Sequence, residues 1–216
     1  MYRAYKTAIR MASKTASKNL KIVVFVGSAR DGRLGERVKN FMMNRLKARN
    51  YEINVIDAAD NEFTMLNRPV FFYGNDREGA PKFLVEKEKF VKEADAYVII
   101  SPEYNHCIPP GLTNMIDHFG GSCFSMKPSG LVTYSAGQYG GMRAAMQLRA
   151  LTGELGCLSV SNIFGIPSAQ KSLDTEGNPL NEHMESGAKK LLDQLDWMAW
   201  AMKNHRAVQP AFEIPK

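Results

Sequence analysis

The chain has 216 residues, of which 44% are hydrophobic and 23% are charged, a composition typical of one globular domain with a sizeable core. No apolar run approaches the roughly 18 residues that a membrane-spanning helix needs. The net charge is +6, but five of the 28 basic residues lie in residues 1–20, which contain no acidic residue. The remaining 23 basic and 22 acidic residues nearly cancel, which argues against nucleic acid as a partner.

Residues 1–20, MYRAYKTAIRMASKTASKNL, form a basic extension that is rich in Ser, Thr and Ala. This composition is typical of a mitochondrial transit peptide, and a flexible basic tail or a stray first helix would have it as well. We expect residues 21–216 to form a single domain. The expected location is the cytoplasm, or the mitochondrion if residues 1–20 are a transit peptide.

The three cysteines, Cys107, Cys123 and Cys157, are odd in number, do not form C-x-x-C and have no histidine at metal-ligand spacing. They indicate a reducing compartment and argue against a disulfide framework or a structural zinc site. We therefore expect no metal.

Strands and helices are predicted to alternate along the chain. Apolar, β-prone segments predict five strands, and apolar residues at helical spacing predict the helices between them. Residues 60–81 contain Pro, Gly and Asn and predict a loop. The predicted strands are Lys21–Val26, Tyr51–Asp57, Tyr97–Ile100, Leu131–Tyr134 and Leu158–Ile163, and the predicted helices are Leu34–Leu46, Lys82–Glu93, Pro110–Phe119, Gly141–Leu155 and Glu182–Met202.

Apolar strands that alternate with helices predict a parallel sheet covered on both faces. The expected fold is a three-layer, doubly wound α/β fold with five parallel strands, of the flavodoxin-like type, whose ligand lies beyond the carboxyl ends of the strands. On the helix at 82–93, we expect Phe83, Val85 and Phe90 to face inward. Trp197 and Trp200 are three residues apart and are expected to share a helix face for packing or oligomer contact.

The loop after the first strand, GSARDGRLGE, is suited to a phosphate group. Its glycines at 27, 32 and 35 do not fit G-x-G-x-x-G, and it lacks the Gly-Lys-Ser/Thr of a Walker loop. Ser28 offers a hydroxyl, Arg30 and Arg33 offer guanidinium groups, and backbone N–H groups near 34–36 open a helix. These features predict a monophosphate ester such as that of flavin mononucleotide (FMN). The alternative is a plain strand-to-helix turn with surface arginines.

Two further loops follow the third and fourth strands and are expected to meet the first. SPEYNHCIPPG at 101–111 presents polar and aromatic groups that fit the edge of a planar heterocycle. YSAGQYGGMR at 134–143 has glycines that let the backbone approach a ligand closely. Either loop could instead serve only to end its strand or to pack a helix tightly. All three together at corresponding strand ends predict one site.

Over roughly residues 20–170 the chain resembles the NADPH-dependent FMN reductase family. Three motifs carry the resemblance: GSARDGRLGERV, PEYNHCIPPGLTNMIDHF and SAGQYGGMRAAMQLRALTGELG. Many members have a second serine where this chain has Arg33, which could pair with phosphate through its fork geometry or point to solvent. The resemblance implies that the FMN phosphate is surrounded by Ser28, Arg30, Leu34, Gly35 and Glu36, with Arg33 a further candidate. It implies that the isoalloxazine is lined by Pro102, Glu103, Tyr104 and Asn105, and that the third side is closed by Ser135 and Gly137.

The resemblance also implies a ping-pong reaction. NADPH or NADH reduces the bound flavin, and a quinone, azo compound, free flavin or similar small acceptor then takes the electrons. No catalytic triad is expected; His106 could protonate an acceptor, and a structural or capping role is the alternative. Family members suggest a homodimer or homotetramer. The competing functions are a flavodoxin-type electron carrier and a non-catalytic FMN-binding protein.

Overall fold

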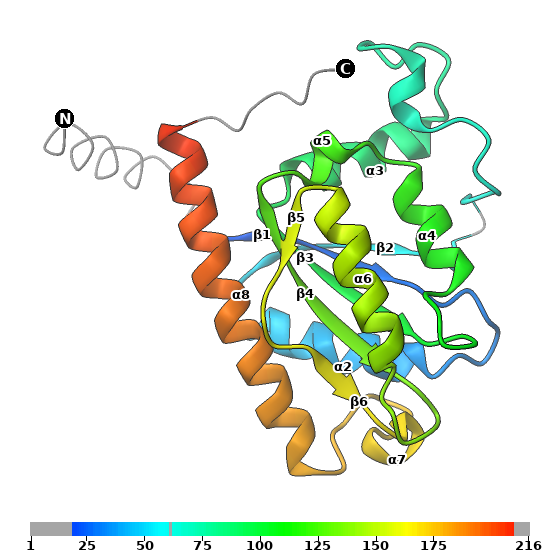
Figure 1. Ribbon diagram of the computed structural model, residues 1–216, viewed down its shortest axis with the longest axis vertical. Coiled ribbons are helices and arrows are strands. Elements are labelled where there is room, and N and C mark those ends of the chain that lie inside the picture. The colour runs from blue at the N-terminus through cyan, green and yellow to red at the C-terminus, as the bar shows by residue number, and fades with distance from the viewer. Residues whose placement is uncertain (1–18, 61, 210–216) are drawn as a thin grey trace, which may run out of the picture.

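The computed structural model describes residues 19–60 and 62–209 (Figure 1). Residues 1–18, which carry most of the possible transit peptide, therefore lie outside the described residues. The elements in chain order are β1 (Lys21–Val26), α2 (Gly35–Lys47), β2 (Glu52–Asp57), the 3-10 helix η1 (Val70–Tyr73), α3 (Lys82–Glu93), β3 (Ala96–Pro102), α4 (Pro110–Asp117), α5 (Gly121–Phe124), β4 (Lys127–Tyr134), α6 (Met142–Glu154), β5 (Cys157–Ser159), β6 (Phe164–Ile166), α7 (Ala169–Ser172) and α8 (Glu182–Val208).

The strands form one parallel sheet in the order β2-β1-β3-β4-β5, with β6 also paired to β4. The predicted doubly wound, flavodoxin-like topology is confirmed. The strand order reverses between β1 and β3, so the loops after these two strands leave the sheet side by side.

The predicted fifth strand is interrupted. Leu158–Ile163 was expected to be continuous, but β5 ends at Ser159 and β6 begins at Phe164. Between them, Arg149 of α6 donates to the carbonyls of Val160 (3.1 Å) and Ser161 (2.6 Å). The Arg149 side chain thus binds backbone carbonyls that a neighbouring strand would otherwise bind. The predicted strand is therefore divided into two short ones.

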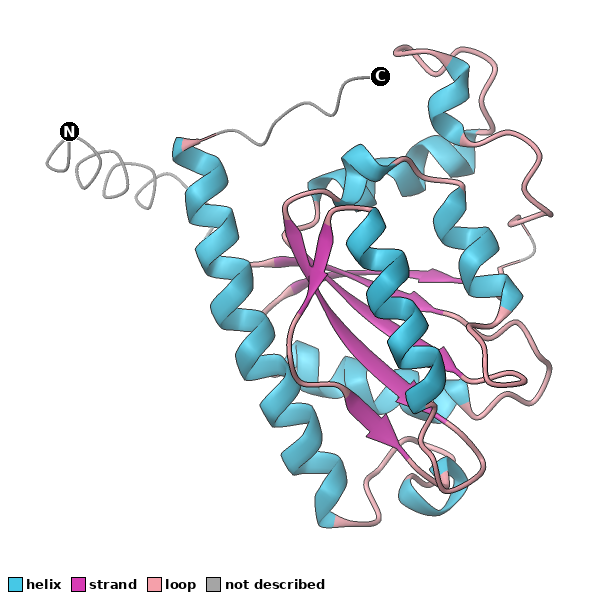
Figure 2. Cartoon of the chain, in the orientation of Figure 1, coloured by secondary structure: helices cyan, strands magenta, loops and turns pink. Residues whose placement is uncertain are grey.

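Helices cover both faces of the sheet, as the three-layer prediction requires (Figure 2). Alternate strand residues supply the two cores. On one face, Val24 and Ile100 pack in the cluster that includes residues of α2 and α8. On the other, Phe25 and Ile99 pack in the cluster that includes residues of α3, α4 and α6. Among the described residues, no helix has both the length and the apolar character needed to cross a membrane.

The inner face of α3 differs from the prediction. The difference is partial: Phe83 and Phe90 are half-buried and pack against the core as predicted, whereas Val85 is half-buried without being part of that cluster, and the fully buried residues are Leu84, Glu88 and Val91. Glu88 is accepted inside because Arg77 donates to both of its carboxylate oxygens (2.9 and 2.6 Å) and Lys92 pairs with it at 2.9 Å. Because one residue of the buried face is charged, the spacing of apolar residues alone does not identify which face of α3 is buried.

The two tryptophans of α8 differ in burial. Trp200 is half-buried and packs against the core, but the side chain of Trp197 is 76% exposed. Trp200 therefore serves packing, and Trp197 is left on the surface.

Candidate functional site

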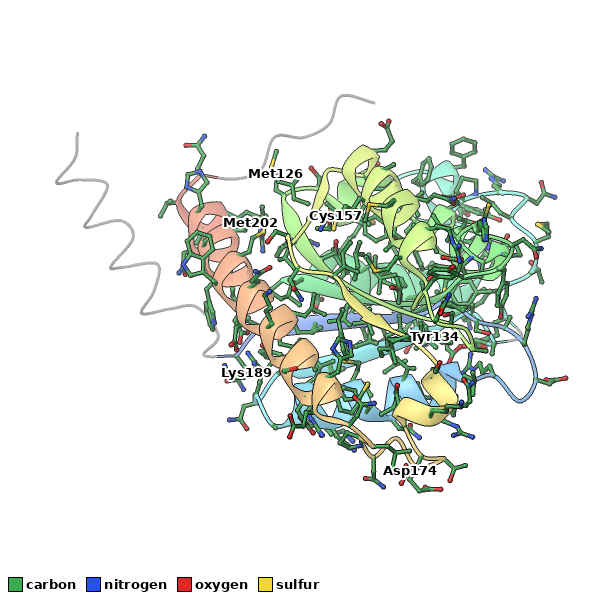
Figure 3. The ribbon with its side chains drawn as sticks, turned by 60° about the horizontal axis from the view of Figure 1, so that its bottom comes forward. Met126, Tyr134, Cys157, Asp174, Lys189 and Met202 are labelled. Carbon is green, nitrogen blue, oxygen red and sulfur yellow. The ribbon has the colours of Figure 1, made fainter. Side chains whose placement is uncertain are left out.

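The loops after β1, β3 and β4 meet at the carboxyl ends of these strands around a cavity of about 270 Å³. Tyr134, labelled in Figure 3, is the last residue of β4, while Met126 lies at the opposite end of that strand. Of the predicted site residues, the cavity is lined by Ser28, Arg30, Arg33, Leu34, Pro102, Glu103, Tyr104 and Ser135. It is also lined by four residues that were not predicted, Asp31, Gly32, Tyr134 and Ala136. Four predicted residues are not among its lining residues: Gly35 and Glu36, which open α2, and Asn105 and Gly137, which lie in the second and third loops.

Ser28 joins the first loop to the second. Its side chain is buried, and its hydroxyl shares a hydrogen bond of 2.6 Å with the hydroxyl of Tyr104. The guanidinium carbon of Arg30 lies 3.7 Å from the centre of the Tyr104 ring, a cation–π arrangement. Arg30 is otherwise exposed, and within 19–60 and 62–209 it forms no ion pair. Its positive charge is therefore available to an anion in the cavity.

Arg33 has different surroundings from Arg30. Its guanidinium donates to both carboxylate oxygens of Asp57 (2.5 Å each), to Glu36 (2.9 Å) and to the carbonyl of Ser28. The hydrogen bond to Asp57 outweighs partial burial and raises the pKa of Arg33. The chain thus places Arg33 beside the cavity but already surrounds it with acceptors.

The second loop is a tight turn. Tyr104 and Cys107 exchange backbone hydrogen bonds (3.1 and 2.9 Å), and Asn105 and His106 between them have φ of 50° and 65°. Two consecutive positive φ values identify a type I′ turn, in which asparagine is favoured. Gln147 of α6 donates to the carbonyl of His106 (3.0 Å) and so holds the turn against that helix. Asn105 and His106 are consequently exposed at its tip.

Glu103 points away from the second loop into the start of α6. Its carboxylate accepts from the backbone N–H groups of Arg143 (3.0 Å) and Ala144 (3.3 Å) and from the Arg143 side chain (2.6 Å). Burial opposes its ionisation, but these donors outweigh burial and lower the pKa of Glu103. Glu103 therefore fixes the position of the second loop relative to the helix that follows the third.

The third loop turns sharply and lies close to the first. Gly141 has φ of 74° and no room for a Cβ atom, which would lie 3.0 Å from the backbone of Tyr134. A Cβ atom on Gly35 would lie 2.4 Å from the Tyr134 hydroxyl oxygen. Burial raises the pKa of this hydroxyl, which therefore stays protonated. Ser135 donates to the carbonyl of Gly137 (2.9 Å), closing the loop on itself.

The four lining residues that were not predicted could have been identified from the sequence. Tyr134 ends a buried strand, as Pro102 does, and this position alone places it at the carboxyl edge of the sheet. Asp31, Gly32 and Ala136 lie inside the predicted loop motifs, between residues that were selected. Asp57, which touches Arg33, also ends a strand and would have been found by the same rule.

Residues 20–171 match the model of the family described as NADPH-dependent FMN reductase. This chain belongs to that family. The family resemblance drawn from the three loop motifs is confirmed, and with it the flavin cofactor and the dependence on reduced nicotinamide.

Relatives of this FMN reductase family member include a quinone reductase of Escherichia coli (strain K12), 28% identical over 138 residues, or 62% of this chain and 70% of the relative. An FMN-dependent NADPH-azoreductase of Staphylococcus saprophyticus is 26% identical over 186 residues, or 82% of this chain and 93% of the relative. Among solved structures, the flavoenzyme NAD(P)H:(acceptor) oxidoreductase FerB of Paracoccus denitrificans has a TM-score of 0.67 at 21% identity, covering 86% of this chain and 98% of that one. This structural likeness confirms the fold.

Proposed function

We propose that FMN lies in the cavity between the loops after β1, β3 and β4. Its phosphate would meet Arg30 and the N-terminal end of α2, and its isoalloxazine would lie between the second and third loops. The observation that carries this proposal is Arg30, an exposed cation that lines the cavity and has no carboxylate partner in the described chain. A helix N-terminus next to an arginine is a favourable place for a phosphate dianion.

Other residues of the cavity also suit this ligand. Tyr104 supplies an aromatic wall whose position is fixed by Ser28 at 2.6 Å. Ser135 and Ala136 of the third loop line the cavity on another side. A planar heterocycle needs such a combination of a flat apolar wall, a few polar groups and unoccupied room.

The chain's own residues bind and orient, and the cofactor carries the electrons. When bound, FMN would supply two-electron redox chemistry between reduced nicotinamide and a second small molecule, in a ping-pong order. Relatives named quinone reductase and azoreductase support quinones and azo compounds as acceptors. We assign no proton transfer to His106, because it lies at the tip of the turn and does not line the cavity.

We also propose that the chain forms a homodimer or homotetramer. Large apolar side chains that stay exposed support this, among them Met146 (51%) and Trp197 (76%). Exposed apolar groups of this size are common at subunit contacts. Sedimentation equilibrium tests it: a mass of two or four chains is expected, and a single-chain mass at micromolar concentration contradicts it.

Steady-state turnover tests the proposed function. NADPH and NADH are each combined with a panel of quinones, azo dyes and free flavin, using protein reconstituted with FMN. We expect oxidation of at least one nicotinamide with at least one acceptor, and parallel lines in double-reciprocal plots. Intersecting lines would contradict the ping-pong order. Negligible nicotinamide oxidation with bound FMN would favour an electron carrier, and absence of FMN binding would overturn the proposal.

A further inference from the structure

Arg33 has no terminal N–H group left for a phosphate. Its four terminal N–H donors meet four acceptors of the protein, namely both oxygens of Asp57, one of Glu36 and the carbonyl of Ser28. The Arg33 side chain is only 11% exposed. To bind a phosphate through these groups, Arg33 would have to abandon at least one charge-assisted hydrogen bond, which is among the stronger contacts a side chain makes.

The sheet fixes the position of Asp57. Parallel pairing of β2 with β1 places Asp57 beside Val26, the last residue of β1 and two residues before Ser28. The N–H of Ala58 donates to the carbonyl of Val26 (2.9 Å), and the N–H of Ala59 donates to the Asp57 carboxylate (3.0 Å). Asp57 is therefore a rigid anchor on a strand next to the first loop.

We propose that Asp57 and Arg33 form a latch that holds the first loop in its phosphate-binding shape. Asp57 is then a positioning residue for FMN, acting through Arg33 on the loop, and neither side chain contacts the phosphate. The latch ties a strand end to the carbonyl of Ser28 and, through Glu36, to the first turn of α2. This inference rests on the proposed FMN site. Many family members have a serine at the position of Arg33. The pairing with Asp57 gives the arginine of this chain a structural role that a serine would not need.

The latch and a direct phosphate contact predict opposite effects of one substitution. Asp57→Asn removes the charge that holds Arg33. If Arg33 were a phosphate ligand restrained by Asp57, this change would free its guanidinium and FMN would bind as tightly as before or more tightly. If the pair is a latch, the loop loses its shape and FMN binds more weakly, as it would in Arg33→Ala.

FMN and riboflavin are titrated by flavin fluorescence into the apoprotein of wild type, Asp57→Asn, Arg33→Ala and the double variant. We expect FMN affinity to fall about tenfold in each single variant, the size of one charge-assisted hydrogen bond. Because the two residues act as a unit, the double variant should be no weaker than the singles. Riboflavin, which lacks the phosphate, should bind with unchanged affinity in all four. Glu185→Gln, which breaks the ion pair of Arg45 near the other end of α2, is the matched control and should bind both ligands like wild type.

Wild-type or tighter FMN binding by Asp57→Asn overturns the latch, as does a strictly additive double variant. Arg33→Lys decides the matter if Asp57→Asn does not fold. Lysine keeps the charge but cannot pair with both carboxylate oxygens in fork geometry, so a latch predicts the weak binding of Arg33→Ala. FMN binding like wild type by Arg33→Lys overturns it. Failure of the wild-type protein to bind FMN would instead refute the proposed function, so the two failures are distinguishable.

Discussion

Arg30 and Arg33 lie three residues apart in one loop, yet their guanidinium groups meet different partners. Arg30 rests on the ring of Tyr104 and is exposed, whereas Arg33 is paired with Asp57 and Glu36. An exposed cation over an aromatic ring keeps its N–H groups available, because the ring face contacts only the plane of the guanidinium. Arg30 is therefore the side chain on which phosphate recognition is expected to depend.

Replacing Arg30 with Ala should weaken FMN binding by about 2 kcal/mol, or roughly 30-fold, through loss of a charge-assisted phosphate contact. Riboflavin binding should change much less. The measurement is a fluorescence titration of both ligands into the folded apoprotein. Arg68→Ala is the control, since Arg68 stacks on Tyr73 at 4.1 Å but does not line the cavity. Unchanged FMN affinity in folded Arg30→Ala would contradict the phosphate assignment.

At this scale the sequence predicts residue positions better than residue contacts. Loop motifs identified Ser28 and Arg33 as site residues, and both line the cavity. Their partners lie 76 and 24 residues away, Tyr104 in the loop after β3 and Asp57 at the end of β2, and the pairing of the strands in the sheet brings them close. Motifs report local chain geometry, whereas these contacts depend on tertiary structure.

Lys127, the first residue of β4, connects elements at the end of the sheet away from the cavity. Its buried ammonium donates to the carbonyls of Val91 (3.0 Å) and Lys92 (2.7 Å) at the end of α3, and of Cys123 (2.7 Å) in α5. Carbonyls in the last turn of a helix lack partners within the helix, so a cation is favourable there. Burial, more than nearby Arg206, lowers the pKa of Lys127 to about 8.

The depressed pKa of Lys127 predicts a pH dependence of stability. Between pH 8 and the ordinary value of 10.5, the unfolded chain binds more protons at this site than the folded chain. The free energy of unfolding should therefore rise with pH over this window, by up to about 3 kcal/mol from this group. Denaturant unfolding of wild type and Lys127→Met isolates the effect, because the other titrating groups cancel in the difference. A difference that is flat or falls between pH 8 and 10.5 would contradict the prediction.

Element boundaries were predicted correctly for some elements and not for others: β4 begins at Lys127, four residues before the predicted start, and α8 extends to Val208, beyond the predicted Met202. β1 and α3 begin and end at the predicted residues, Lys21–Val26 and Lys82–Glu93. The prediction failed where a polar side chain intervened. Arg149 interrupts the last strand by binding its carbonyls, and Glu88 occupies the buried face of α3 through its ion pairs. Neither effect can be read from hydrophobic spacing, because each depends on a polar partner outside the element itself, Arg77 for α3 and Arg149 of α6 for the last strand.

At the scale of the whole molecule, the contacts that join β1 to the last helix and the loops that surround the cavity lie at opposite ends of the sheet. At the amino end, Asp95 accepts from the backbone of Lys21 (2.9 Å) and from Lys203 of α8 (2.7 Å), joining β1 to the last helix. At the carboxyl end, three loops surround the cavity. This separation follows from the parallel topology, in which every strand delivers its following loop to one edge. Among the described residues, Arg30 can therefore remain without an ion-pair partner at the cavity, because the contacts of Asp95 that join β1 to α8 lie at the other end of the sheet.

An anaerobic titration of the FMN-reconstituted protein tests the central claim most directly. NADPH is added in small portions while the visible flavin absorbance is recorded, and a quinone is then added under the same conditions. We expect one FMN per chain, complete bleaching by about one equivalent of NADPH and full recovery by about one equivalent of quinone, as two-electron transfer requires. A chain that retains no FMN, or whose bound FMN is bleached by neither NADPH nor NADH, would contradict the account.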